Sequence, residues 1–439
     1  MAIILLFLVS CSEMETKWTR EIDALGPGNY IVNSISSLKN ETYVIGTYWQ
    51  GQEDSRCFTA MYHNDGSLDW FNVFESPGVK KAEGIEIVAS TSSAEQVDAG
   101  KEVYVLVKTT NANGHQSVVL AGYDTLRNVD WQNTVISSEG TLDAALLSDH
   151  VGNLYVVGWE KDSDNRSNIY VGKYNESGDV AWFTKYYNDE LDFTDLQYDM
   201  IRSNYLLMTG VLETSGELFY IRYDASGQFM GYSIHEGLSV NELSSAKIDP
   251  EGNVYITASI DDPEHGEDYV TIVYDRHNNL RWTSQYDGAA HRNDRPKAIA
   301  IDESFNVYVG GISENEEGIP VITVVKYDST GSSVWMKNLP QKDAAELILM
   351  EPRYIPMGRY DEERYLYIGG ITGDKAFIAR CNLDGVFSWS NQYGQSGTIT
   401  EPTAISGHVL AFQSIEDGQS HARIMKFGPS MIIGLARWD

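Results

Sequence analysis

Two neighbouring stretches decide the fold: residues 298–313 read AIAIDESFNVYVGGIS, and residues 321–339 read VITVVKYDSTGSSVWMKNL. Together they hold four apolar runs of roughly four to eight residues, the length of β-strands. The turn between the last two runs is Asp328-Ser-Thr-Gly331. Asp caps backbone N–H groups in such turns, and Gly accepts a positive φ. We therefore predict four antiparallel strands, A to D, at 298–301, 307–310, 321–327 and 334–338.

This unit recurs along the chain, and one spacing identifies it. An aromatic residue at the end of strand C is followed eight residues later by a Trp on strand D. The pairs are Tyr62/Trp70, Tyr123/Trp131, Tyr174/Trp182, Tyr274/Trp282 and Tyr327/Trp335, with Cys381/Trp389 as a variant. The fourth copy departs from the rule, because Gly231 lies eight residues after Tyr223 and Tyr232 follows it.

Strand B recurs eight times, at Tyr43, Tyr104, Tyr155, Leu207, Tyr255, Tyr308, Tyr367 and Leu410. A repeated four-stranded antiparallel unit is a propeller blade. The sequence thus predicts an all-β chain that forms a single eight-bladed β-propeller. We expect the Trp of strand D to fill the wedge between neighbouring blades.

The last copy lacks a strand D after its strand C at 422–427, and the N-terminus offers one. Residues 17–23 (KWTREID) match residues 281–287 (RWTSQYD). We therefore predict that a strand through Trp18 closes the ring. The alternative is closure by residues 431–438, where Trp438 lies eleven residues beyond Phe427.

The pattern D-x-x-G-N-V-Y-V-x-G, followed by K-Y-D-x-x-G-x-x-x-W, resembles the bacterial β-propeller repeat family labelled SBBP, over about residues 17–427. That resemblance implies seven blades, which stays the alternative to eight. The part D-x-x-G-x-x-x-W is also similar to the tryptophan-docking motif of quinoprotein-type eight-bladed propellers. That group includes an outer-membrane-assembly lipoprotein as well as dehydrogenases.

The N-terminus, MAIILLFLVSCSE, carries an apolar run at residues 3–9 that is too short to span a bilayer. It fits a secretory signal, and Leu8-Val9-Ser10-Cys11 resembles a bacterial lipobox with Cys11 as the lipid anchor. We expect a signal peptide at 1–10, a tether at 11–16 and the propeller at 17–439. The expected location is the cell envelope, at the outer membrane. A chance match is the alternative, since no Lys or Arg precedes the run.

Charge and cysteine content exclude several classes. The formal net charge is −31, with 63 acidic and 32 basic residues, which disfavours nucleic acid as a partner. The three cysteines form neither a disulfide framework nor a zinc motif. We predict that Cys57 and Cys381 are buried free thiols; a bridge between first and last blades is the alternative.

The B–C and D–A loops lie on one face of such a ring, and they are long, varied and acidic. Loops of this kind carry binding sites in rigid scaffolds. We predict that this face binds a protein or glycan of the cell envelope. We expect no cofactor; Ca²⁺ bound by such carboxylates is the alternative, although Asp162-x-Asp164-x-Arg166 is a poor calcium loop. The candidate residues are Trp49, Trp159, Asp261, Asp262, Glu264, Glu316 and Glu317. The alternative for the acidic residues is a solvated surface, and the alternative for the two Trp residues is packing against a neighbouring loop.

No catalytic motif stands out. The chain lacks G-x-S-x-G, HExxH and a vicinal Cys pair, and its nine His show no metal-ligand spacing. The sequence therefore favours a non-enzymatic binding or scaffold protein, with no catalytic residue and no metal ligand assigned. A hydrolase or lyase with a carbohydrate substrate, acting at the acidic axial end, is the alternative.

Overall fold

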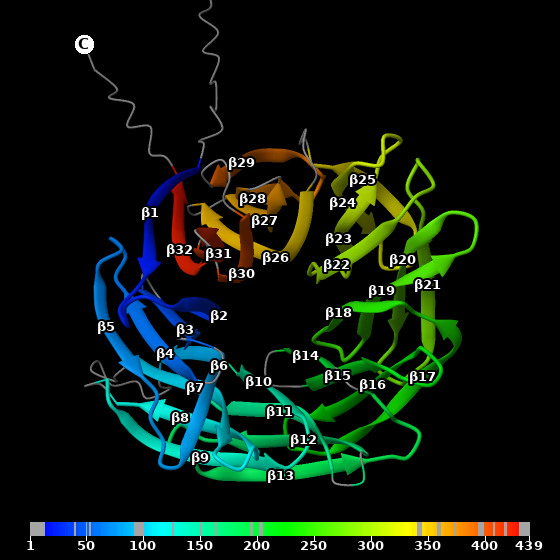
Figure 1. Ribbon diagram of the computed structural model, residues 1–439. Coiled ribbons are helices and arrows are strands. Elements are labelled where there is room, and N and C mark those ends of the chain that lie inside the picture. Colours follow the sequence, from blue (N-terminus) through cyan, green and yellow to red (C-terminus); the bar gives the residue numbers. More distant parts are fainter. Residues whose placement is uncertain are drawn as a thin grey trace, which may run out of the picture.

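The structure of the chain is a computed structural model. It describes residues 14–429 apart from 39–40, 50, 52–53, 92–100, 125–126, 150–151, 163, 165, 194–195, 202–204, 340–344, 358–360, 373–374, 394–398, 407–408 and 417–418. Within these residues the chain is all-β and forms eight four-stranded antiparallel sheets. They surround one axis as the blades of a propeller (Figure 1).

The strands follow the predicted order A to D in each of the first seven blades. Blade 1 contains β2 (Asn29–Leu38), β3 (Glu41–Trp49), β4 (Ser55–Tyr62) and β5 (Leu68–Val73). Blade 2 contains β6 (Val79–Thr91), β7 (Lys101–Asn111), β8 (Gln116–Tyr123) and β9 (Val129–Ser138). Blade 3 contains β10 (Leu142–Ser148), β11 (Leu154–Lys161), β12 (Ser167–Tyr174) and β13 (Val180–Tyr187). Blade 4 contains β14 (Leu196–Ile201), β15 (Tyr205–Val211), β16 (Glu217–Asp224) and β17 (Phe229–Ser239).

The second half of the ring repeats this arrangement. Blade 5 contains β18 (Glu242–Ile248), β19 (Val254–Asp262), β20 (Gly266–Tyr274) and β21 (Leu280–Tyr286). Blade 6 contains β22 (Asp294–Ile301), β23 (Val307–Glu314), β24 (Pro320–Tyr327) and β25 (Ser333–Asn338). Blade 7 contains β26 (Ala345–Met357), β27 (Asp361–Thr372), β28 (Lys375–Asn382) and β29 (Phe387–Tyr393). Blade 8 contains β30 (Ile399–Ser406), β31 (Val409–Glu416), β32 (Gln419–Pro429) and β1 (Met14–Ile22).

The core lies between the blades. The middle strands are buried, as β11 is along its whole length, whereas the outermost strands alternate between exposed and half-buried residues, as β13 does. Apolar side chains of neighbouring sheets meet in shared clusters; Leu106 and Leu120 of blade 2 pack with Leu142 and Val156 of blade 3. Burial of this apolar surface holds each blade to the next.

Trp131 and Trp282 of strand D lie at blade boundaries, as predicted, and dock on the C–D turn of the following blade. Trp131 Nε1 donates to Glu176 O at 3.2 Å, and Trp282 Nε1 donates to Ser329 O at 3.2 Å. Two residues later, Asn133 and Ser284 donate to the carbonyls of the turn glycines Gly178 and Gly331. At these two boundaries the repeat therefore binds one blade to the next through main-chain acceptors as well as apolar contact.

Blade 4 lacks this tryptophan, and a buried arginine takes its place. Arg222 lies on β16 opposite Gly231. Arg222 is 1% exposed. Its Nη2 donates to Arg276 O at 3.0 Å, the carbonyl that corresponds to Glu176 O and Ser329 O in the other turns. Nη1 donates to Gly252 O at 2.7 Å. The fourth copy thus keeps the inter-blade contact with a different side chain.

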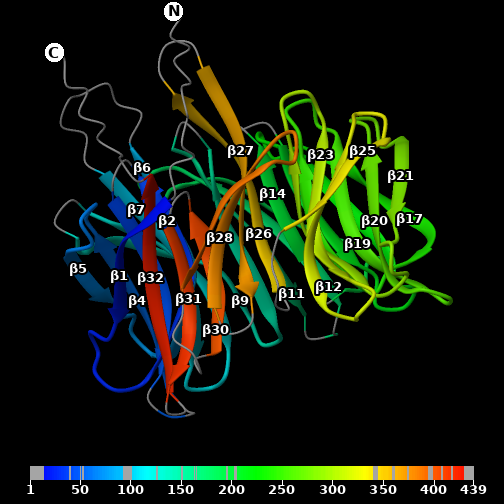
Figure 2. The same ribbon diagram turned by 90° about the horizontal axis from the view of Figure 1, so that it is seen from above.

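The N-terminal strand closes the ring, as predicted. β1 pairs antiparallel with β32, and both lie side by side in Figures 1 and 2. Trp18 faces Lys426, and Thr16 faces Phe427, with Lys17 as the bulged residue. The covalent hairpins have the same register; Trp335 faces Lys326 and Ser333 faces Tyr327. The closure by residues 431–438 concerns a segment outside the described residues, and strand D of blade 8 is β1.

The turns confirm the predicted role of Asp. Asp328 Oδ1 accepts N–H groups from Thr330 and Ser332, and Asp302 Oδ1 accepts those of Ser304 and Asn306. In the turn that lacks Gly, Phe305 adopts a φ of 60°. A bulky residue in this left-handed region is strained.

Cys57 and Cys381 are buried free thiols, as predicted. They lie in blades 1 and 7, with blade 8 between them. Cys11 lies outside the described residues, whereas β1 begins at Met14, within the segment expected to be a tether. Across the described part of the chain, no helix has the length and apolar character needed to cross a membrane.

Candidate functional site

The B–C and D–A loops lie on one face of the ring, which we call the variable face; the A–B and C–D turns lie on the opposite, regular face. Not all acidic groups of the variable face are free. Asp162 Oδ1 accepts the backbone N–H groups of Asp164 and Arg166, and Arg166 forms ion pairs with both aspartates. Arg166 therefore neutralises part of the charge of this loop, and Asp162 stabilises its turn.

Trp159 does not lie on the predicted binding surface, because its side chain is buried. β11 continues to Lys161, so Trp159 stays inside the sheet and does not follow it. Its side chain is 4% exposed and packs edge-on against Phe193, with ring centroids 6.0 Å apart. A buried indole has no face for a ligand, so Trp159 takes the packing alternative.

Trp49 has a different environment. It ends β3 and lines a cavity of about 560 Å³ between blades 1 and 2, together with Lys81, Glu83, Lys108 and Asp143. Lys108 Nζ donates to Leu142 O at 3.1 Å. An aromatic wall with a few polar groups of both signs is typical of a small-ligand pocket.

The acidic candidates of blades 5 and 6 lie on two neighbouring loops, β19–β20 and β23–β24. Glu264, Glu316 and Glu317 are exposed and form no ion pair with any residue that the structure describes. Asp261 accepts a hydrogen bond from Asn241 at 2.5 Å. Asp262 Oδ1 accepts the N–H groups of Glu264 and His265, so Asp262 holds the turn.

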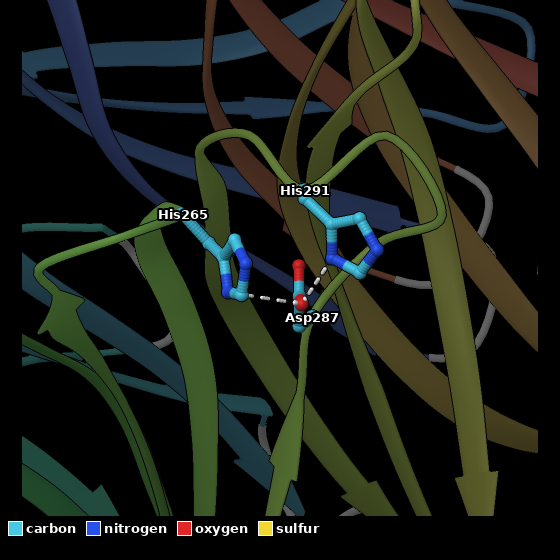
Figure 3. Close-up of side chains that lie close together, drawn as sticks. All are labelled: His265, Asp287 and His291. Carbon is cyan, nitrogen blue, oxygen red and sulfur yellow. Dashed lines mark hydrogen bonds and ion pairs between the residues drawn. The ribbon is translucent and has the colours of Figure 1, made fainter.

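Between these loops the structure brings together three side chains that the sequence did not connect. His265 from the β19–β20 loop and Asp287 and His291 from the β21–β22 loop offer ligand atoms within 4.8 Å of one another (Figure 3). His291 Nδ1 lies 2.5 Å and His265 Nδ1 3.5 Å from Asp287 Oδ2. The two imidazole rings lie 4.7 Å apart.

Asp287 also belongs to a second, more buried group with Asp268 and Asp294, which we call the aspartate triad. Its ligand atoms are also within 4.8 Å of one another. Burial raises the pKa of Asp268, while a hydrogen bond from Gln285 opposes the shift and the charge of Asp287 adds to it. Burial likewise raises the pKa of Asp294 to about 6.

Neither group could be predicted from the sequence, because its members are far apart along the chain. His265 and Asp268 lie just before and within β20, whereas Asp287, His291 and Asp294 lie between the end of β21 and the start of β22. One signal was present: residues 291–295, which run from the β21–β22 connection into β22, are all polar and include His291 and Asp294. The spacing of His265 and His291 carries no motif, because the fold and not the local sequence brings them together.

The fold and its loops define the chain as an eight-bladed β-propeller with an acidic cluster on its variable face. No family model and no curated protein matches the chain. Among solved structures it is similar to the WD40 domain of SCAP from fission yeast, at 10% identity and a TM-score of 0.40. That likeness covers 84% of this chain and 98% of that chain.

Two further solved structures are similar to this chain. An apocarotenoid oxygenase mutant from Synechocystis gives 8% identity and a TM-score of 0.43, over 88% of this chain and 98% of that chain. A protein of unknown function from Bacteroides caccae gives 12% identity and a TM-score of 0.33, over 69% of this chain and 94% of that chain. Likenesses this distant carry no information on what the chain binds.

Proposed function

We propose that this chain is a non-enzymatic binding propeller of the cell envelope, and that its partner is a protein segment rich in Lys and Arg. The partner docks on the loops of blades 5 and 6. The observation that carries the proposal is the set of exposed, unpaired carboxylates there, Glu264, Glu316 and Glu317. Opposite charge on a partner steers its approach and fixes its orientation.

The test uses a variant that neutralises this surface and keeps the turns. It carries Asp261→Asn, Glu264→Gln, Glu316→Gln and Glu317→Gln, and leaves Asp262 in place because that side chain caps a turn. A synthetic oligolysine peptide serves as the probe in a calorimetric titration. We expect at least about tenfold weaker binding to the variant at low salt.

Asp164→Asn is the control, because Arg166 already pairs with that carboxylate, while Asp162 stays in place to hold its turn. Quantitative pull-down from envelope extracts then compares the same two variants with the wild type. Equal recovery of every protein by the wild type and the neutralised variant would sink the proposal.

The proposed location is the outer membrane, through a lipid on Cys11. As strand D of blade 8, β1 starts at the regular face and ends at the variable face. A tether just before Met14 would therefore turn the regular face to the membrane and the variable face to the partner. Cys11→Ser should move the protein from the membrane fraction to the soluble fraction; an unchanged membrane fraction contradicts the anchor.

A second candidate function rests on the cavity beside Trp49. Its aromatic wall, with Glu83, Asp143 and two lysines, fits an acidic or neutral sugar. Trp49→Ala should abolish any binding of uronic-acid oligosaccharides in a calorimetric titration, while the Glu316→Gln variant keeps it. Release of shorter sugars during the titration would favour the hydrolase or lyase alternative; no heat with any oligosaccharide would remove this candidate.

A further inference from the structure

The aspartate triad crosses the boundary of two blades. Asp268 lies on β20, Asp287 follows β21, and Asp294 begins β22. One carboxylate oxygen of each lies within 4.8 Å of the other two. Like charges this close repel unless a proton or a cation lies between them.

The burial of the triad points to a ligand. Asp268 is 0% and Asp294 is 1% exposed. Among the described residues, Oδ1 of Asp268, Oδ1 of Asp287 and Oδ1 of Asp294 are buried atoms without a hydrogen-bond partner. The other oxygens are occupied: Gln285 donates to Asp268 Oδ2 at 2.6 Å, and the Gly288 N–H donates to Asp294 Oδ2 at 2.6 Å. Unpaired buried carboxylate oxygens are costly, and each member of the triad has one.

Among the described residues no Lys or Arg pairs with the triad, whereas a lysine pairs with an aspartate at a corresponding place in the ring. Between blades 3 and 4, Lys161 Nζ lies 2.7 Å from Asp192 Oδ1. The two places correspond because Glu213 N donates to Asp192 O, as Glu314 N donates to Asn293 O. Near the triad, Arg295 pairs with Glu267 instead.

We propose that Asp268, Asp287 and Asp294 bind a Ca²⁺ ion at the boundary of blades 5 and 6. Three carboxylates give the all-oxygen ligand set that this hard cation takes, with main-chain oxygens or water completing the shell. His265 and His291 face Asp287 Oδ2, which orients that carboxylate and leaves its Oδ1 for the ion. The ion neutralises the triad and joins blade 5 to blade 6.

The test measures Ca²⁺ binding to the full chain after removal of metal with EDTA and dialysis. Calorimetric titration with CaCl₂ should show one site. Melting should shift upward by at least about 2 °C once free Ca²⁺ exceeds the dissociation constant by about 100-fold. Asp268→Asn and Asp294→Asn should each weaken binding at least about tenfold and remove the shift in melting temperature.

Folding of the variants is checked without calcium. Each Asn variant should then melt at or above the wild type, because a buried repelling charge has been removed. Glu264→Gln, an exposed carboxylate of the same blade, is the control that keeps wild-type Ca²⁺ binding. Oligolysine binding by Asp268→Asn should stay unchanged, which separates this inference from the proposed docking surface.

Three results would overturn the inference. One is a wild type that gives neither heat nor a melting shift with Ca²⁺. Another is undiminished Ca²⁺ binding by both Asn variants. The third is a protein that ignores Ca²⁺ but binds Zn²⁺ in a manner lost in His265→Gln and His291→Gln, because the ion would then belong to the histidines.

Discussion

Arg222 replaces a tryptophan in the packing between blades 4 and 5, although it lies on the neighbouring strand. Its removal leaves the carbonyls of Gly252 and Arg276 without their donor in a buried place. We expect Arg222→Met to lower the free energy of unfolding by about 2–4 kcal/mol, measured by urea denaturation.

Lys326→Met is the matched control, because Lys326 holds the same position in blade 6 and donates to Leu383 O at 3.1 Å. Trp335 Nε1 also donates to that carbonyl, at 3.3 Å, so the acceptor keeps a partner. We expect Lys326→Met to lower the free energy of unfolding by less than about 1 kcal/mol. Equal losses at both positions would show that Arg222 does not take the place of a tryptophan.

The pKa of Asp294 predicts a pH dependence for the calcium-free protein. Burial raises this pKa from 3.8 to about 6, so the folded state holds the proton more tightly than the unfolded state. The protonated Asp294 therefore stabilises the folded state. This contribution to the free energy of unfolding is complete below about pH 4 and is lost as the pH rises through about 6. It amounts to at most about 3 kcal/mol. Melting in EDTA should therefore fall more steeply from pH 4 to 7 in the wild type than in Asp294→Asn. Asp261→Asn should keep the wild-type slope, and identical slopes for all three would contradict the assignment.

At the scale of elements, the turn glycines of strands C and D act between blades as well as within one. Gly331 has a φ of +86°, and an added Cβ would lie 2.6 Å from Trp282 Cδ2. Gly114 has the same φ of +86° but open space around it. We expect Gly114→Ala to cost about 1 kcal/mol for its backbone alone. Gly331→Ala should cost at least about 2 kcal/mol more, since it also displaces the docked indole.

Thermal and urea denaturation of both variants checks this prediction. Because the backbone conformation is matched, the difference between the two losses isolates the contact across the blade boundary. Similar losses would mean that the tryptophan moves aside without cost.

The sequence predicted those elements whose signal is local. The eight-residue spacing from Tyr to Trp reports one hairpin, so blades, turns and even the strand through Trp18 could be identified from the repeat. The variable face could not be predicted to the same depth. Trp159 looked like a loop residue because the end of β11 has no stop signal, and the sheet continues to Lys161. The aspartate triad joins three segments whose proximity depends on how two blades pack, which no spacing encodes.

At the scale of the whole molecule, stability depends on one non-covalent closure between the chain ends. Glu21 of β1 accepts from His421 and Arg423, residues about 400 positions away. Arg20 Nε also donates to the carbonyl of the turn glycine Gly66 at 2.6 Å, so β1 contacts blade 1. Asn133 and Ser284 make the same contact with the turn glycines of blades 3 and 6. Contacts this distant in sequence form late in folding, because their loop-closure entropy must be paid first.

Deletion of residues 1–22 should therefore open the ring rather than trim an end. β32 would still pair with β31 but would become an edge strand, whose N–H and C=O groups on the β1 side are free as a template for pairing with another chain. We expect a lower melting temperature and a shift to dimers or larger species in light scattering. A synthetic peptide of residues 14–22, added in trans, should pair with β32 and restore the monomer. A scrambled peptide of the same composition should not, because the register of Trp18 against Lys426 depends on the order of residues. A truncated chain that stays monomeric and has the melting temperature of the full chain would mean that blade 8 is stable with three strands.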